Sequence, residues 1–296
     1  MASLLGRATR EVYRRELIPA RARWWLAAAG MRDWYRTLGS ELRPHLGDRA
    51  RPLLSELSVR MFARRYDELC RARPDLPDRT RDPRALGLLM GALYRIERAP
   101  RAAWIFAAAG GSAAGPIDRA RAAWMIHAWP AEARWEEVTT HLGELLIVLT
   151  EDLPPHLPHA RKVLSDICFA SGQRFAQHAR RFLGLRDGEA SAPALAIEVL
   201  RMSEYVFRVN PEHRSHADAA SGTGWLEGNA CPWFTRPGWH AAHCGIFGQF
   251  QSGIASAFGL RYNLDRTIPK HGGDVCKIDL KPIALRRSAG GGPVNR

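Results

Sequence analysis

Residues 261–280 read RYNLDRTIPKHGGDVCKIDL, and this stretch decides the fold class. Its first part, 261–267, alternates polar and apolar side chains, which is the spacing of a β-strand. The central KHGGD run carries two consecutive glycines and predicts a tight turn. After this turn Cys276, Ile278 and Leu280 alternate with polar residues. We therefore expect a second, half-buried strand whose inward face includes Cys276.

The sequence before this pair of strands predicts further strands and a helix. A short alternation at 205–209 predicts one strand, and 229–234 is another candidate. A Pro-Gly pair precedes a predicted helix over 239–258, and Gly259 ends it. Strands that lie this close in sequence favour a small antiparallel sheet.

The N-terminal half reads as helical. Val59, Phe62 and Tyr66 recur at i, i+3 and i+7, which places them on one apolar stripe of a helix. The segments 86–96 and 135–149 repeat this pattern, and prolines separate the stripes. Nothing in this half has catalytic spacing, so we expect it to pack on the rest without supplying a nucleophile.

A further helix is predicted over 160–184, with Gly184 at its C-terminal end. Together these patterns predict an α+β protein with a small antiparallel sheet. We expect a helical region over 1–155, an α+β domain over 156–285 and a disordered, glycine-rich tail over 286–296.

Composition limits the partners that the chain can have. The 296 residues are 46% hydrophobic, which suffices for a sizeable core, and the net charge is +13. Arginines and acids are interleaved, as in Arg14-Arg15-Glu16, which favours a solvated basic surface over a specific nucleic-acid site. No secretory signal and no uncharged apolar run of 18 residues is present, so we expect a cytoplasmic protein without a membrane partner. The oligomeric state stays open.

Five cysteines without a secretory signal indicate reduced thiols rather than a disulfide framework. Cys244 lies about one turn into the predicted helix, where the helix dipole stabilises a thiolate. His240 is four residues earlier and shares its face. A thiol, a helix start and an imidazole are the components of an activated nucleophile, so Cys244 is the favoured candidate.

Cys276 and Asp274 each have two interpretations. Cys276 is a buried core thiol or a second reactive thiol, and Asp274 is a turn residue or a carboxylate that orients a histidine. We expect Cys244, His240, Asp274 and Cys276 to line one cavity.

A zinc site is the alternative for this region. Cys231, His240, Cys244 and Cys276 would make a Cys3His set, but no CxxC or CxxH pair is present. The ligands would also come from three separate elements. We therefore expect neither a metal nor another cofactor.

Several segments resemble the L-2-amino-thiazoline-4-carboxylic acid hydrolase family over about residues 160–285. They are ICFASGQRF at 167–175, NACP at 229–232, the His243-Cys244 pair and LDRT at 264–267 leading to GDVCKIDL at 273–280. That family is in turn distantly similar to the vinyl-reductase-type, hydrocarbon-binding domains. The stretch Gly245–Phe250 departs from the family because it carries no acidic residue.

The resemblance implies two functions. The first is a cysteine-dependent hydrolase or cyclase that acts on a C–N bond of a small, polar, cyclic amidine- or amide-like substrate. The second is a non-catalytic ligand-binding or sensor module. For the enzyme, Cys244, Asp274, Cys276 and His240 are the expected catalytic residues. The expected substrate-binding residues are Cys231, His243 and His271.

Overall fold

The computed structural model describes residues 4–72, 82–110, 115–186, 188–207, 213–229 and 231–283. The predicted tail at 286–296 and Val209 lie outside these residues. The α-helices are α1 Leu4–Arg14, α2 Ala20–Glu41, α3 Arg43–Leu46, α4 Ala50–Ala72, α5 Pro83–Leu93, α6 Pro116–Ala128, α7 Ala131–Asp152, α8 Ala160–Leu183, α9 Ala192–Val206, α10 Ala241–Ser256 and α11 Ile268–His271. The 3-10 helices within these ranges are η1 Gly47–Arg49, η2 Ile96–Arg98 and the longer η3 Pro100–Ala109.

The four strands are β1 His213–Asp218, β2 Thr223–Gly228, β3 Leu260–Arg266 and β4 Cys276–Pro282. They form one antiparallel sheet in the order β1-β2-β4-β3. Leu226 of β2 and Leu264 of β3 both pair with Ile278 of β4, so these three side chains share one face of the sheet. The α+β class, with helices first and a small antiparallel sheet late in the chain, is confirmed.

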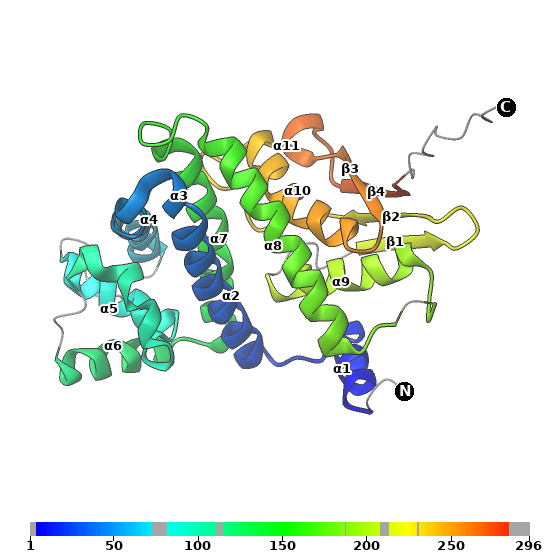
Figure 1. Cartoon of the computed structure of the whole chain (residues 1–296). Helices are drawn as coiled ribbons and strands as arrows, with labels where there is room; N and C mark the ends of the chain where they lie inside the picture. The colour runs from blue at the N-terminus through cyan, green and yellow to red at the C-terminus, as the bar shows by residue number, and fades with distance from the viewer. Residues whose placement is uncertain are drawn as a thin grey trace, which may run out of the picture.

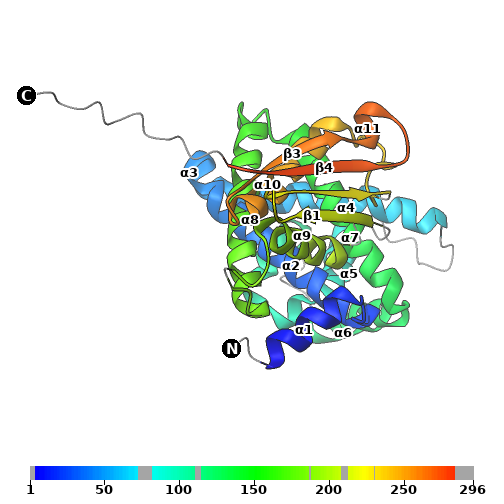
Figure 2. The same cartoon turned by 90° about the vertical axis from the view of Figure 1, so that its right-hand side faces the viewer.

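α5 and α6 lie at one side of the molecule and the strands at the other, with α2 and α7 between them (Figures 1 and 2). α9 and α10 contact the strands, and α8 packs closely on α10. Local sequence explains several helix limits. Prolines occupy the first turn of α5, α6 and α9, where a missing N–H is tolerated, and Gly184 ends α8 with φ +66°.

Two predicted strands are wrong. The alternation at 205–207 lies at the end of α9 and just after it, where Leu195, Val199 and Leu200 form a buried helical face. Residues 232–234 form turns after β2 has ended at Gly228. The hairpin of β1 and β2 was not predicted.

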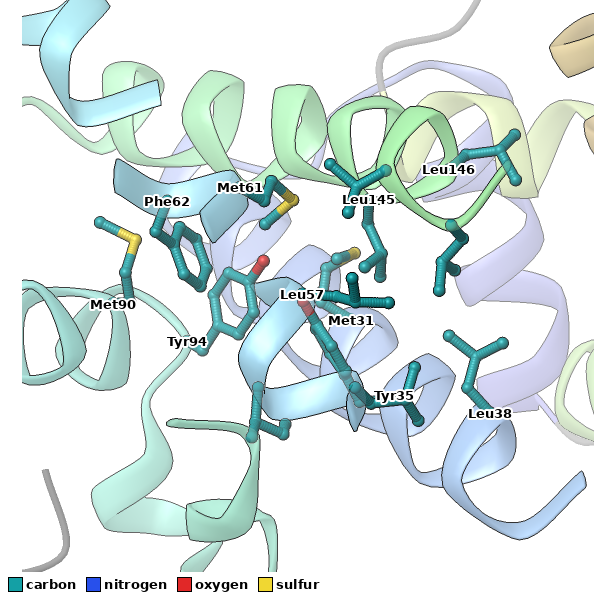
Figure 3. Close-up of a cluster of buried hydrophobic side chains, with 14 of the residues drawn as sticks. Met31, Tyr35, Leu38, Leu57, Met61, Phe62, Met90, Tyr94, Leu145 and Leu146 are labelled. Atoms are coloured by element: carbon teal, nitrogen blue, oxygen red, sulfur yellow. The ribbon is translucent and has the colours of Figure 1, made fainter. Parts of the chain in front are cut away.

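The larger of two hydrophobic clusters is built mainly by α2, α4, α5 and α7. Figure 3 shows part of it, with Tyr35, Phe62, Tyr94 and Leu145 converging from different segments. The same cluster continues past residue 155 and includes Trp233. The smaller cluster lies between α8, α9, α10 and the sheet. Among the helices that the structure describes, none is both long and apolar enough to cross a membrane.

Candidate functional site

A cavity of about 70 Å³ lies between the sheet, α9 and α10. It is much smaller than the roughly 300–1,000 Å³ pockets that hold drug-sized ligands, so it suits a small molecule. Three cysteines, several aromatic rings and a few polar side chains line it. The lining residues are Glu204, Leu226, Cys231, Trp233, Trp239, Cys244, Phe247, Gln251, Tyr262, Leu264, Thr267, Cys276 and Ile278.

Regular spacing brings these side chains to one place. On α10, Cys244, Phe247 and Gln251 stand at i, i+3 and i+7, which is one helix face. On β4, Cys276 and Ile278 are two residues apart and therefore share the inward face. The cavity thus forms where a helix face meets the inner face of the sheet.

Cys244 and Cys276 are partly buried, and each sulfur accepts a hydrogen bond. The indole Nε1–H of Trp239 donates to Cys244 Sγ at 3.3 Å, and the backbone N–H of Ile268 donates to Cys276 Sγ at 3.4 Å. Burial raises the pKa of both thiols above its usual value, while these two hydrogen bonds act in the opposite direction. The fold therefore places an N–H donor at each of these two sulfurs.

Cys231 precedes Trp233 in the loop after β2 and completes the set of three thiols. Burial raises its pKa to about 12, and the neighbouring Cys244 and Cys276 raise it further. This electrostatic effect on the pKa of Cys231 requires the other two sulfurs to be close, as expected for three thiols that line one cavity. Of the three, Cys231 has the thiol that ionises least readily.

Three predicted residues lie on the surface. His240 is exposed at the N-terminus of α10, where its Nδ1 accepts a hydrogen bond from the backbone N–H of Ala242 at 3.3 Å. His271 is exposed, and its Nδ1 accepts from the backbone N–H of Thr267. Asp274 is exposed in the loop before β4. The cavity therefore joins Cys244 and Cys276 without His240 and Asp274.

His243 is fully buried next to the cavity rather than in its lining. Its Nδ1 accepts a hydrogen bond from the backbone N–H of His240 at 3.1 Å, so the proton of the neutral ring is on Nε2. Nε2–H then donates to Thr150 Oγ1 at 2.6 Å. Burial is the main reason that the pKa of His243 falls to about 4. The ring is neutral at pH 7, and its hydrogen bond to Thr150 links α10 to α7.

Sequence reasoning missed a polar group in the lining. Glu204 of α9 is buried and pairs with Arg201, whose Nη1 lies 3.0 Å from Oε2. The amide of Gln251 donates to Glu204 Oε1 at 3.0 Å, and the hydroxyl of Tyr262 donates to Gln251 Oε1 at 2.6 Å. Of these polar residues, only Gln251 could have been placed near the site from the sequence, because it follows Cys244 by seven residues and therefore shares its helix face.

Thr267 carries a further indication of a ligand. It is 4% exposed and lines the cavity, and its hydroxyl has no hydrogen-bond partner within the described part of the chain. A buried hydroxyl without a partner is unfavourable, and a bound molecule would supply one.

The Cys3His set considered for zinc is not assembled. Cys231, Cys244 and Cys276 share the cavity, whereas His240 is exposed outside it. Across the described ranges from 4 to 283, no group of three or more His, Cys, Asp and Glu side chains is arranged to hold a metal ion.

The arrangement can bind a small molecule and present thiols to it. A thiol of this cavity becomes a nucleophile once its proton is removed, and the N–H donors at Cys244 and Cys276 favour that form at these two sulfurs. Comparison of the chain with models of protein families, with curated proteins and with solved structures finds no match in any of the three.

Proposed function

We propose that the protein is a cysteine-dependent enzyme that hydrolyses or closes a C–N bond in a small cyclic amidine- or amide-like molecule. The observation that carries the proposal is the meeting of Cys231, Cys244 and Cys276 in one small cavity. The resemblance to the thiazoline-carboxylate hydrolases supports the same chemistry. The proposal includes a cytoplasmic location, a small-molecule substrate and no specific nucleic-acid partner.

In the proposed reaction the thiolate of Cys244 or Cys276 attacks the C=N or C=O carbon of the ring. A carbon–sulfur bond forms, the ring C–N bond breaks, and the leaving nitrogen takes up a proton. Water then adds to the same carbon and releases the thiol. Ring closure is this sequence in reverse, with loss of water. Binding in a small cavity contributes by holding the ring close to the sulfur.

The test is turnover of a panel of small cyclic amidines and lactams that includes L-2-amino-thiazoline-4-carboxylic acid. Ring opening is followed by mass spectrometry for the wild type and for Cys231→Ser, Cys244→Ser and Cys276→Ser. The proposal expects turnover by the wild type and a loss of about 100-fold or more in Cys244→Ser or Cys276→Ser. Unchanged turnover in both of these variants would exclude covalent catalysis by either thiol.

A second candidate is a small-ligand-binding or sensor module. It is favoured by the apolar share of the lining, which includes Trp233, Trp239 and Phe247, and by the raised pKa values of the thiols. Thiols that stay protonated at neutral pH are poor nucleophiles. Saturable binding of panel compounds without any turnover over pH 6–9 would support this candidate over the enzyme.

A further inference from the structure

Three arginines from different elements converge on two consecutive tryptophans of α2. The guanidinium carbon of Arg95, a residue between α5 and η2, is 4.5 Å from the ring centre of Trp25 and 5.7 Å from that of Trp24. Arg134 of α7 lies over Trp24 at 4.3 Å. Arg21 of α2 lies over Trp25 at 5.1 Å. The shared rings therefore hold Arg95 within about 10 Å of both other guanidiniums, and we call these three side chains the arginine cluster.

The charge of the arginine cluster lacks a counter-ion at ion-pair distance. In the parts of the chain that the structure describes, none of its three arginines pairs with a carboxylate. Arg134 is only 7% exposed, and its buried Nε has no hydrogen-bond partner in those parts. Its Nη1 donates to Nδ1 of His127 at 3.0 Å, so this histidine accepts as a neutral ring. A buried cation without an anion is unfavourable, and a bound anion would stabilise it.

Neighbouring groups of the arginine cluster repel one another. Burial lowers the pKa of Arg134, and the charge of Arg21 lowers it further. The pKa of His127 is lowered by burial first and by Arg134 next. Arg21 and Arg95 act on His127 in the same direction, and Glu97 opposes them. An anion among these groups would relieve the repulsion.

The arginine cluster also lies at the starts of two helices. Arg21 is in the first turn of α2 and Arg134 in that of α7, and neither helix has a side-chain cap at its N-terminus. A helix start disfavours a cation and favours an anion, which its free N–H groups can bind. Glu132, the acid in the first turn of α7, already pairs with Arg23 at 3.8 Å. The cluster therefore offers an anion both charged donors and two helix starts.

Arg95 occupies a backbone conformation that arginine rarely adopts. Its φ of +55° and ψ of +46° lie in the left-handed region, directly after the C-cap Tyr94 of α5. Glycine is usual where a helix ends in this way, because it has no Cβ to clash. Glycine would complete the same turn, so what the arginine adds is its guanidinium on Trp24 and Trp25. Strained residues of this kind gather at sites of binding and catalysis.

We infer that the arginine cluster binds a phosphate group, at a site separate from the cavity of the three thiols. None of the three arginines is among the residues that line that cavity. A guanidinium presents pairs of N–H donors that match the oxygens of a phosphate, and stacking on tryptophan fixes its orientation. A phosphate carries more charge and more oxygens than a carboxylate, so it can bridge guanidiniums from separate elements. The site goes beyond the proposed function and holds whether or not the cavity is catalytic.

Calorimetric titration of the full chain tests this site. Inorganic phosphate, pyrophosphate and acetate are each added at the same ionic strength, which keeps general screening equal. We expect saturable binding of phosphate and pyrophosphate, with an affinity at least about 10-fold higher than for acetate, because a phosphate can engage two guanidiniums. Absence of saturable phosphate binding would overturn the inference, and so would equal affinity for acetate.

Two variants assign the binding to the arginine cluster. Arg21→Gln and Arg95→Gly each remove one guanidinium and should weaken phosphate binding about 10-fold or more. Glycine favours the left-handed backbone, so Arg95→Gly should keep its fold. Unchanged affinity in both folded variants would overturn the inference.

Arg51→Gln is the matched control, because it removes the same charge from a guanidinium that lies over Trp104 at 5.4 Å. Arg51 packs beside Gly39 near the end of α2. Gly39 follows Arg21 by 18 residues, which is about 27 Å along the helix. At that distance salt screens the charge, so the affinity for phosphate should stay within about twofold of the wild type. A loss in Arg51→Gln equal to that in Arg95→Gly would show a general effect of net charge and overturn the inference.

Vesicles of phosphatidylcholine, with and without phosphatidic acid, identify the carrier of the phosphate. Cosedimentation with the phosphatidic acid vesicles alone, reduced in Arg95→Gly, would assign a lipid headgroup. Phosphate binding without cosedimentation would assign a soluble ligand. Both results agree with the inferred site. Neither depends on turnover in the cavity, so ring opening and phosphate binding succeed or fail independently.

Discussion

Burial raises the pKa of Cys244 and of Cys276, and an N–H donor at each sulfur lowers it. Trp239 donates to Cys244 Sγ, whereas a backbone N–H serves Cys276. Trp239→Phe keeps an aromatic side chain but removes the indole N–H that donates to Cys244, and it leaves the donor of Cys276 unchanged. We expect the pKa of Cys244 to rise further and its alkylation by iodoacetamide at pH 8 to slow several-fold, as the loss of one hydrogen bond of about 1 kcal/mol implies.

Cys276 is the internal control for this prediction, because its donor comes from the backbone of Ile268. Its alkylation rate should stay within about twofold of the wild type. Equal slowing of both thiols would indicate a general change in access to the cavity rather than the loss of a hydrogen bond.

His243 makes the stability of the fold depend on pH. Its pKa is about 4 in the folded protein, against 6.5 for an ordinary histidine. Between these values the unfolded chain binds more protons, so the free energy of unfolding falls as pH drops from about 6.5 to about 4. Above pH 6.5 the contribution is fully present. The expected size is about 1–3 kcal/mol over this window.

Urea unfolding at pH 7 and pH 4.5 measures this effect. His243→Gln keeps a hydrogen-bonding side chain but does not titrate, so it should lose less stability between the two pH values than the wild type. His240→Gln is the comparison, since His240 is exposed. An equal loss in the wild type and in His243→Gln would show that other groups cause the acid sensitivity.

The crossing of α8 and α10 is the closest helix contact around the site. Gly172 of α8 and Gly253 of α10 let the two backbones approach, and a Cβ on either would lie 1.9 Å from Phe250 O or 2.0 Å from Phe169 O, respectively. These atoms belong to the backbone and cannot move without separating the helices. Gly172→Ala or Gly253→Ala should cost about 3 kcal/mol or more, or prevent folding.

Gly245 provides the control, because it lies in α10 and a Cβ there would meet nothing within 4 Å. Gly245→Ala should leave the free energy of unfolding unchanged or raise it by up to about 1 kcal/mol, since alanine favours a helix. Circular dichroism during urea unfolding compares the three variants. Similar costs at all three positions would show that helix propensity, not the crossing, determines the result.

The elements that the sequence predicted well have a clear local signal. α10 and β4 follow a Pro-Gly pair and a Gly-Gly turn, and their limits agree with the structure to within about two residues. The end of α9 was predicted as a strand because the alternation at 205–209 is too short to distinguish a strand from the end of a helix. Missing α9 also meant missing Glu204.

The candidate site was predictable only in part for a similar reason. Cys244 and Cys276 could be identified because Cys244 lies near the start of a helix and Cys276 at the start of a strand. At such positions the local spacing of residues indicates which way a side chain faces. His240 has the right spacing from Cys244, yet it caps the helix and stays exposed. Whether a side chain enters a cavity depends on contacts between distant segments, such as Glu204 with Gln251, and spacing does not encode them.

Contacts across the whole molecule bind the helical region to the site. Trp233, which lines the cavity, is 1% exposed and donates its indole N–H to Thr139 O of α7 at 2.8 Å. Arg236, three residues later, pairs with Glu144 of α7 and Glu68 of α4. The loop that positions Cys231 is thus held by helices of the N-terminal half.

These contacts bear on whether residues 156–285 form an independent domain, which stays a prediction. The larger hydrophobic cluster joins α2, α4 and α7 to Trp233, Trp239 and Ile246 across the boundary at 155. A separate domain would expose these side chains to water. Burial of one large side chain is worth about 1.5–3 kcal/mol, so exposing these three would cost about 4.5–9 kcal/mol, which is comparable to the whole 5–15 kcal/mol stability of an ordinary domain.

We therefore expect the full chain to unfold in one cooperative transition and a fragment of residues 156–285 to lack cooperative unfolding. Differential scanning calorimetry of both, together with near-UV circular dichroism of the tryptophans, measures this. Trp233→Ala in the full chain should lower the free energy of unfolding by about 3–5 kcal/mol, because it leaves a cavity at the junction. The exposed Trp124 of α6 is the control, and Trp124→Ala should change the free energy of unfolding by less than about 0.5 kcal/mol. Two separate transitions in the full chain, with the upper or lower one reproduced by the fragment, would instead establish 156–285 as a domain and show that its cavity forms without the helical half.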